Sequence, residues 1–442
     1  MKKIDLTQGK VIKVLTLLAL PVMGSSLLQF TYSLIDMLWV GALGSDAVAS
    51  IGSSSFFTGL GYAINSLVVI GTGIKVAHAL GRGNEDEAKD YINTGLFING
   101  VIGILFALLL IFGGKSLIGF LDLNNPVVER DSYIYLLVNA PNMFFTFYNF
   151  LFTRIFGSYG NNSDALKITS IGLVTNIILD PILIYVVDLG VAGAALATLV
   201  ANIIMFILFR IKAKGLLKYD FKRGLDKAKA NEILRLGFPM AIQRVLFTMV
   251  NIILAKIIAV YGSDAIAAQK IGLQIESVGF MIIGGLNGAI MSFTGQNFGA
   301  KKYRRIKEGY ATALKIGFVY SSLMALGFIF FGRPIVQLFI REEATVLISI
   351  SYLQIVAISQ VFSMIEMVSN GLYTGLGMPK IPAIISIIFT ILRIPMAIVF
   401  TEFMGLDGIW LSVSISSILK GITAYIIYIV KVRKRYDNVE IN

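Results

Sequence analysis

Twelve long apolar runs constrain this 442-residue chain more than any other feature of its sequence. A membrane-spanning helix needs about 20 consecutive apolar residues. Runs of that length lie near 14–39, 47–76, 92–113, 131–153, 164–187, 190–210, 234–260, 265–295, 310–332, 344–372, 381–403 and 408–430. Only 14% of the residues are charged, against about 25% in soluble domains. The sequence therefore predicts an all-α integral membrane protein with twelve transmembrane helices.

Links rich in basic residues alternate with links that have few or none along this predicted bundle. Basic residues are frequent at the N-terminus (Lys2, Lys3), after every second run, in the central link 211–232 and in the tail up to Arg435, whereas the links after the first, fifth and seventh runs carry none. Cytoplasmic links are enriched in Lys and Arg, so both termini are expected in the cytoplasm of a cell-membrane protein. The basic residues behind the net charge of +12 are then signals that orient the chain in the membrane, next to anionic lipid. They do not indicate nucleic-acid binding.

The two halves of the chain repeat each other at a displacement of about 218 residues. For example, G-S-D-A-V-A at 44–49 returns as G-S-D-A-I-A at 262–267. Because each repeat holds six runs, an even number, both halves enter the membrane from the same side and a pseudo-two-fold axis along the membrane normal relates them. The predicted division is an N-terminal lobe at 1–210, a basic cytoplasmic linker at 211–232 and a C-terminal lobe at 233–442. We expect the binding site in the cleft between the lobes.

Two carboxylates inside apolar runs of the first half have no counterpart in the second half. Asp36 aligns with Leu254, and Asp180 aligns near Ile394, so the fold alone does not require these acids. A charged side chain facing lipid costs several kcal/mol, and intramembrane acids are functional by default. We therefore expect Asp36 and Asp180 to face protein or water and to act together. The alternative is that both cap helix ends at the membrane interface.

Residues around Asp180 predict an oxygen-lined cradle. Asn176 and Asp180 are four residues apart and share a helix face. Pro181 has no N–H, so the carbonyl of Ile177 loses its usual helical partner. With a hydroxyl from Thr198 on the next run, these groups form a candidate site for Na⁺ or a proton near the membrane centre.

The second half carries polar groups whose roles are more open. The candidate substrate contacts are Gln269, Glu276 and Met281 from this half, together with Tyr32 from the first half. Gln269 and Glu276 are seven residues apart and can share a helix face, and flexible methionines suit loose recognition of apolar ligands. Mutual salt bridges or snorkelling side chains are the alternative for the polar groups, and a lipid-facing or packing role is the alternative for the methionine. That structural interpretation is favoured for Lys256 and Arg393, and Glu366 is left unassigned.

Several classes of chemistry are excluded by what the sequence lacks. The chain has no cysteine and a single histidine, His78, which excludes a His/Cys metal site and argues against a histidine base. No G-x-x-x-x-G-K-[ST] pattern is present, so no ATP-driven motor is expected. We predict a protein that is not an enzyme, that needs no cofactor, and that draws energy from a gradient of H⁺ or Na⁺.

A set of motifs resembles a known transporter family. These motifs are I-D-M-L-W-V-G-A-L-G at 35–44, the G-R-G turn at 81–83, R-I-F-G-S-Y-G at 154–160, N-I-I-L-D-P at 176–181, A-A-Q-K-I-G-L-Q-I-E-S at 267–277 and G-Q-N-F-G-A at 295–300. In order and spacing they resemble the multidrug and toxic compound extrusion (MATE) family over essentially the whole chain. The bacterial branch with an N-x-x-x-D-P motif in the fifth span is most similar.

The resemblance implies a two-lobed, cation-coupled antiporter that expels lipophilic cations by alternating access. It also implies that the positions of Asp36, Asn176, Asp180 and Thr198 carry H⁺ or Na⁺. The chain departs from some members in its second half. Gln243 and Arg244 stand where an acid occurs in span seven, and the nearest acid in span ten, Glu366, is out of register.

Two rival functions remain at this stage. A flippase for a lipid-linked saccharide would favour a strongly cationic cleft for pyrophosphate, and the carboxylates of the first half argue against it. A non-transporting membrane receptor or scaffold would leave unexplained why intramembrane acids occur in one repeat only. The expected partners are lipophilic cations and the lipid bilayer, without nucleic acid, and the chain is expected to be a monomer.

Overall fold

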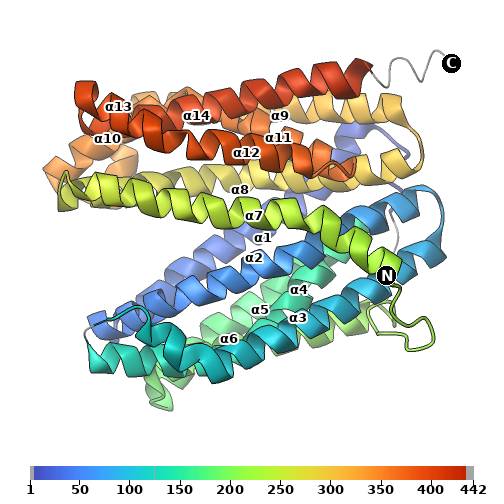
Figure 1. Cartoon of the computed structure of the whole chain (residues 1–442), viewed down its shortest axis with the longest axis horizontal. Coiled ribbons are helices and arrows are strands. Elements are labelled where there is room, and N and C mark those ends of the chain that lie inside the picture. Colours follow the sequence, from blue (N-terminus) through green and yellow to red (C-terminus); the bar gives the residue numbers. More distant parts are fainter. Residues whose placement is uncertain (1–3, 124, 435–442) are drawn as a thin grey trace. The chain divides into compact units, whose positions relative to one another are not determined.

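The computed structural model describes residues 4–123 and 125–434, which form helices joined by short links (Figure 1). In chain order these are α1 (Val11–Gly41), α2 (Ser45–Gly81), α3 (Glu85–Gly119), α4 (Pro126–Ser158), α5 (Asn162–Pro181), η1 (Ile182–Val186), α6 (Gly190–Lys212), α7 (Lys227–Ala259), α8 (Ser263–Gly299), α9 (Tyr303–Gln337), α10 (Glu343–Ala357), α11 (Ser359–Gly375), α12 (Lys380–Ile391), α13 (Arg393–Met404), α14 (Leu406–Ile427) and η2 (Tyr428–Arg433). The predicted all-α class is confirmed. Lys2, Lys3 and Arg435 lie outside the described residues.

Most of the predicted spans meet the length and hydropathy that a membrane crossing requires. Ten helical segments in the described part do so, and α10 with α11 forms an eleventh, bent by 56°. The remaining predicted run, 131–153, lies in α4. This helix has 33 residues, which is long enough to cross a bilayer, but buried asparagines at 139, 142 and 149 lower its hydropathy.

The chain divides into two compact units. The first unit comprises Gly24–Ala241 and the residues just before Leu6; the second comprises Leu6–Met23 and Ile242 onward. This division differs from the predicted lobes at two places. The link 211–232 and residues 233–241 belong to the first unit, and Leu6–Met23 belongs to the second.

Hydrogen bonds and close packing explain why the N-terminal segment belongs to the second unit. The Leu6 N–H donates to Oε1 of Gln296 at 3.0 Å, and Asn297 donates to the Leu6 carbonyl at 3.2 Å. Further along, a Cβ at Gly285 of α8 would lie only 2.4 Å from Cγ of Met23. The first turns of α1 therefore pack directly on α8, which sequence periodicity does not reveal.

In the first unit, α4 is the central helix and packs against α2, α3 and α6. Its fully buried phenylalanines, among them Phe152 and Phe156, contact Phe209 of α6 at ring distances of 5.9 and 5.2 Å. The first part of α7 crosses α2 closely, because a Cβ at Gly237 would lie 1.9 Å from the Leu67 carbonyl oxygen. Small residues at such crossings let transmembrane helices approach backbone to backbone.

In the second unit, α11 packs against α8, α9 and α14. The core beside this helix contains Tyr352 and Trp410, whose rings meet edge to face at 4.9 Å. Within the repeat, α10 and α11 occupy the place of the unbroken α4. The bend in this pair thus distinguishes the two repeats in a way that the sequence did not predict.

Backbone conformation supports the repeat in each unit. Gly44 precedes α2 with φ +105°, and Gly262 precedes α8 with φ +97°. Gly160 and Gly377 form a second pair, with φ of +77° and +78°. Residues other than glycine rarely adopt such angles. The recurring G-S-D-A turn is therefore part of the scaffold, and α2 and α8 end at the corresponding glycines Gly81 and Gly299.

Candidate functional site

Asp180 is the most deeply buried acid of the first unit, with no exposed surface. Its Oδ1 accepts a hydrogen bond of 2.8 Å from Nδ2 of Asn176, so the predicted stacking of the two side chains on one helix face is confirmed. Its Oδ2 is also buried but has no hydrogen-bond partner in the described part of the chain. Burying a polar oxygen without a partner is costly. A proton or a cation bound to this atom would remove that cost.

Pro181 marks the point at which regular α-helix ends beside this acid. The α5 helix reaches Pro181 and continues as the π-helix η1, Ile182–Val186. Proline interrupts the helical hydrogen-bond ladder, and short π-helical segments often occur at functional sites. The predicted contribution of the Ile177 carbonyl to the cradle stays a prediction.

Side chains from α1 and α6 complete the site. The Tyr32 hydroxyl of α1 is within hydrogen-bonding reach of the Thr198 side chain of α6, and it lies near both Asp36 and Asp180. The two carboxyl groups are themselves close enough to interact electrostatically. The structure therefore brings together all four predicted cation-site residues, and it places Tyr32, predicted as a substrate contact, beside them. Asp36 is only partly buried, whereas Asp180 is fully enclosed.

A ladder of asparagines between α4 and α6 continues the site, and the sequence interpretation missed it. Asn202 donates to Oδ1 of Asn142 at 2.9 Å and to the Thr198 carbonyl at 3.1 Å. Asn149 donates to Oδ1 of Asn202 at 3.0 Å, and Asn142 donates to Oδ1 of Asn139 at 2.9 Å. The spacing of asparagines 139, 142 and 149 on one face of an apolar helix was the available signal.

Tyr135 of α4 connects this ladder to the acids. Its carbonyl accepts a hydrogen bond from Asn139 at 3.0 Å, and its hydroxyl is close enough to Asp36 and Asp180 for electrostatic interaction. Two carboxyl groups thus lie among neutral hydroxyl and amide groups contributed by α1, α4, α5 and α6. Oxygen-rich surroundings of this kind suit a hard monovalent cation such as Na⁺, or a proton.

The acid of the second unit, Glu276, has different surroundings. It is buried on α8, its Oε2 accepts a hydrogen bond from the Tyr352 hydroxyl, and its Oε1 accepts one from Nε2 of Gln360. Arg393 is buried nearby and donates to the hydroxyls of Ser416 and Ser417 at 2.9 and 3.3 Å. Because both oxygens of Glu276 already have donors, its contacts favour the structural interpretation. The same holds for Arg393.

The other polar residues singled out in the second half have less defined surroundings. Gln269 and Met281 are half-buried on α8, and Lys256 is exposed on α7. Glu366 is half-buried and interacts electrostatically with Arg393. Substrate contact by Gln269 and Met281 stays a prediction.

Comparison with known proteins gives consistent matches over the whole chain. Residues 21–182 and 239–399 match the MatE family, with one copy in each repeat. The probable multidrug resistance protein YpnP of Bacillus subtilis (strain 168) is 26% identical, over 97% of both chains. The probable multidrug resistance protein NorM of Thermotoga maritima is also 26% identical, over 90% of this chain and 88% of the relative. A crystal structure of MATE in complex with MaL6 has the same fold, with a TM-score of 0.91 at 22% identity and complete coverage of both chains.

Proposed function

The chain belongs to the MatE family of transporters, and on this premise we propose that it exports lipophilic cations in exchange for H⁺ or Na⁺. Relatives named as multidrug resistance proteins support the substrate class. The intramembrane acids of the first unit support ion coupling. Small lipophilic cations and the bilayer are its proposed partners, and the chain works as a monomer in the cell membrane with both termini in the cytoplasm.

One observation carries the coupling proposal: the free Oδ2 of Asp180. This oxygen is buried and unpaired in the described residues, while Oδ1 is already bonded to Asn176. A buried carboxylate with one open oxygen is stabilised by whatever cation reaches it, because burial disfavours an uncompensated charge. Asp36 lies nearby as a second negative group, so together the two acids attract a single positive charge strongly.

The proposed cycle uses the connections that leave this site. Binding of a cation at Asp36 and Asp180 removes the repulsion between the two carboxylates, which then tolerate closer packing. The interaction of Tyr32 with Thr198 links this change in packing to α6. The hydrogen bond from Asn202 to Asn142 links α6 to α4. The ion thereby biases α1 between two arrangements of the first unit, and binding of a cationic substrate favours the ion-free one.

Export of a fluorescent lipophilic cation from reconstituted vesicles tests the proposal. An imposed Na⁺ gradient and an imposed pH gradient are applied separately, which identifies the coupling ion. Asp36→Asn and Asp180→Asn should each abolish gradient-driven export. Asp131→Asn is the matched control, since Asp131 is paired with Arg130 outside the site and should retain export. Unchanged export in both site variants would disprove the coupling role.

A further inference from the structure

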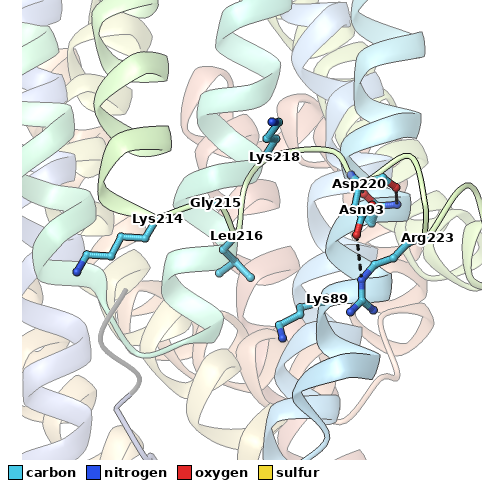
Figure 2. A pocket seen from close by; sticks show the side chains of 8 residues that line it. All are labelled: Lys89, Asn93, Lys214, Gly215, Leu216, Lys218, Asp220 and Arg223. Carbon is cyan, nitrogen blue, oxygen red and sulfur yellow. Dashed lines mark hydrogen bonds and ion pairs between the residues drawn. The ribbon is translucent and has the colours of Figure 1, made fainter.

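A basic cavity lies away from the cation site, where the link between α6 and α7 passes the start of α3. Its volume is about 290 Å³, and it is lined in part by Lys89, Asn93, Lys214, Lys218, Asp220 and Arg223 (Figure 2). Four of these side chains are cationic and one is a carboxylate. Orientation in the membrane requires basic residues in a link, but it does not require that they line a cavity.

The link is fastened to α3, so the cavity is a fixed part of the first unit. Asn93 is only 4% exposed. Its Nδ2 donates to the carbonyls of Asp220 and Gly224 at 3.1 and 2.9 Å, and its Oδ1 accepts from the Asp220 N–H at 2.7 Å. Figure 2 shows Asn93 and Asp220 side by side at one end of the link. Three hydrogen bonds from one buried side chain hold the backbone that carries the lysines.

The positive charge around the cavity is only partly neutralised. Arg223 pairs with Asp90 at 2.6 Å and with Asp86 at 3.3 Å. Lys214 and Lys218 are exposed, and within the described part of the chain their only hydrogen bonds are those of the backbone N–H groups, so neither ammonium group is paired. The cavity is therefore suited to an anion with several acceptor oxygens.

Aromatic residues of the same link indicate where this cavity lies relative to the membrane. The Tyr219 ring contacts Phe97 of α3 at 5.7 Å and Phe221 at 4.9 Å. Phe97 belongs to the apolar stretch of α3, and Phe221 is 87% exposed. Tyrosine and tryptophan are enriched at the headgroup level of a bilayer, and Tyr219 lies between the basic link and the apolar stretch of α3. An exposed phenylalanine beside an apolar helix surface favours insertion among lipids over contact with water.

We propose that this cavity binds the phosphate-bearing headgroup of an anionic phospholipid, in the leaflet that faces the basic link. Lys214 and Lys218 contact the phosphate oxygens, and Lys89 adds a third cation from α3. Phe221 and Tyr219 lie beside the acyl chains. A lipid held there braces the link against α3, so it stabilises the first unit. The identification of this leaflet as the cytoplasmic one rests on the membrane orientation proposed above; the binding of the lipid does not.

Native mass spectrometry of the purified protein with phosphatidylglycerol tests this proposal. Lys214→Gln/Lys218→Gln should weaken lipid binding about 25-fold, because each lysine near an anionic surface contributes roughly fivefold. Lys301→Gln/Lys431→Gln is the matched control, since both lysines are exposed, lie outside the cavity and change the net charge equally. Lys214→Arg/Lys218→Arg should retain binding, because arginine also binds phosphate.

Thermal unfolding in detergent distinguishes the sources of the phosphate. Phosphatidylglycerol should raise the Tm of the wild type, whereas phosphatidylcholine and inorganic phosphate should not. The Gln double variant should lose this shift while its Tm without lipid stays within a few degrees of the wild type. Equal lipid binding by the two Gln double variants would overturn the proposal. A matching shift with inorganic phosphate alone would overturn the choice of a lipid.

Discussion

Replacing Asp180 by asparagine is the sharpest test of the cation site. The change keeps the size of the side chain and an oxygen that can accept the 2.8 Å hydrogen bond from Asn176. It removes the negative charge in a position with no exposed surface. At an effective dielectric of about 20, two unit charges about 4 Å apart attract by about 4 kcal/mol. Loss of that attraction corresponds to roughly a thousandfold weaker binding of Na⁺, and an amide does not take up a proton at all.

The stability of the protein should stay nearly unchanged in Asp180→Asn although transport is lost. Because Oδ2 of Asp180 has no hydrogen-bond partner among the described residues, removing its charge relieves a desolvation cost. The new amide N–H group lacks a partner, which costs about 1–3 kcal/mol. The two effects offset each other, so we expect Asp180→Asn to keep a Tm close to that of the wild type while gradient-driven export is lost.

The assay combines vesicle export with ion binding. Export of a fluorescent lipophilic cation is followed at matched protein content, and Na⁺ affinity or proton release is measured by isothermal titration in detergent. A monodisperse variant with unchanged Tm but no ion response would support the reasoning. A variant that exports at the wild-type rate with the same ion dependence would refute it, because the open carboxylate oxygen would then have no role.

Three further predictions concern stability. Glu276→Ala leaves the Tyr352 hydroxyl buried without its acceptor, and Nε2 of Gln360 loses one acceptor and keeps the Val356 carbonyl at 3.3 Å, so we expect a loss of about 3 kcal/mol as a lower denaturation midpoint. Gly237→Val places a Cβ 1.9 Å from a backbone oxygen and should cost about 3 kcal/mol or more, whereas valine at Gly284, where a Cβ meets nothing within 4 Å, should be tolerated. Asp226→Ala removes acceptors for two N–H groups at the start of α7 and should cost about 1 kcal/mol, read from hydrogen exchange in the first turn.

The Asp226 effect should also depend on pH. Hydrogen bonds from the backbone and side chain of Lys229 hold the pKa of Asp226 below its usual value. A lowered folded-state pKa gives stabilisation that is present above the unfolded value of about 3.9 and lost as pH falls through the folded value. Protection of this turn in the wild type should therefore approach that of Asp226→Ala once the pH is below the lowered folded-state pKa of this carboxyl. A difference that persists unchanged there would contradict the argument.

The sequence by itself determined the class of fold and singled out the two acids of the proposed cation site. Apolar runs of about 20 residues can only be satisfied as membrane helices, and a repeat of constant register fixes where the turns fall. Asp36 and Asp180 were identifiable because the second repeat lacks them. The i, i+4 pairing of Asn176 with Asp180 followed from helix geometry alone, and the structure confirms it.

Tertiary packing decided what lies around those residues. Tyr135 is distant from Asp180 in sequence but lies close enough to interact with it electrostatically, and the packing of α4 against α6 joins Asn142 to Asn202. The assignment of Leu6–Met23 to the second unit depends on side-chain contacts that leave no periodic signal.

The contrast between Asp180 and Glu276 likewise needed the structure. Both are buried acids in apolar runs, so composition and spacing treat them alike. Glu276 has donors for both of its carboxylate oxygens, whereas Asp180 has an open one. Hydrogen-bond saturation depends on which side chains from other helices reach each oxygen. That is a property of the packed bundle, and it separates a structural acid from one that is open to an ion.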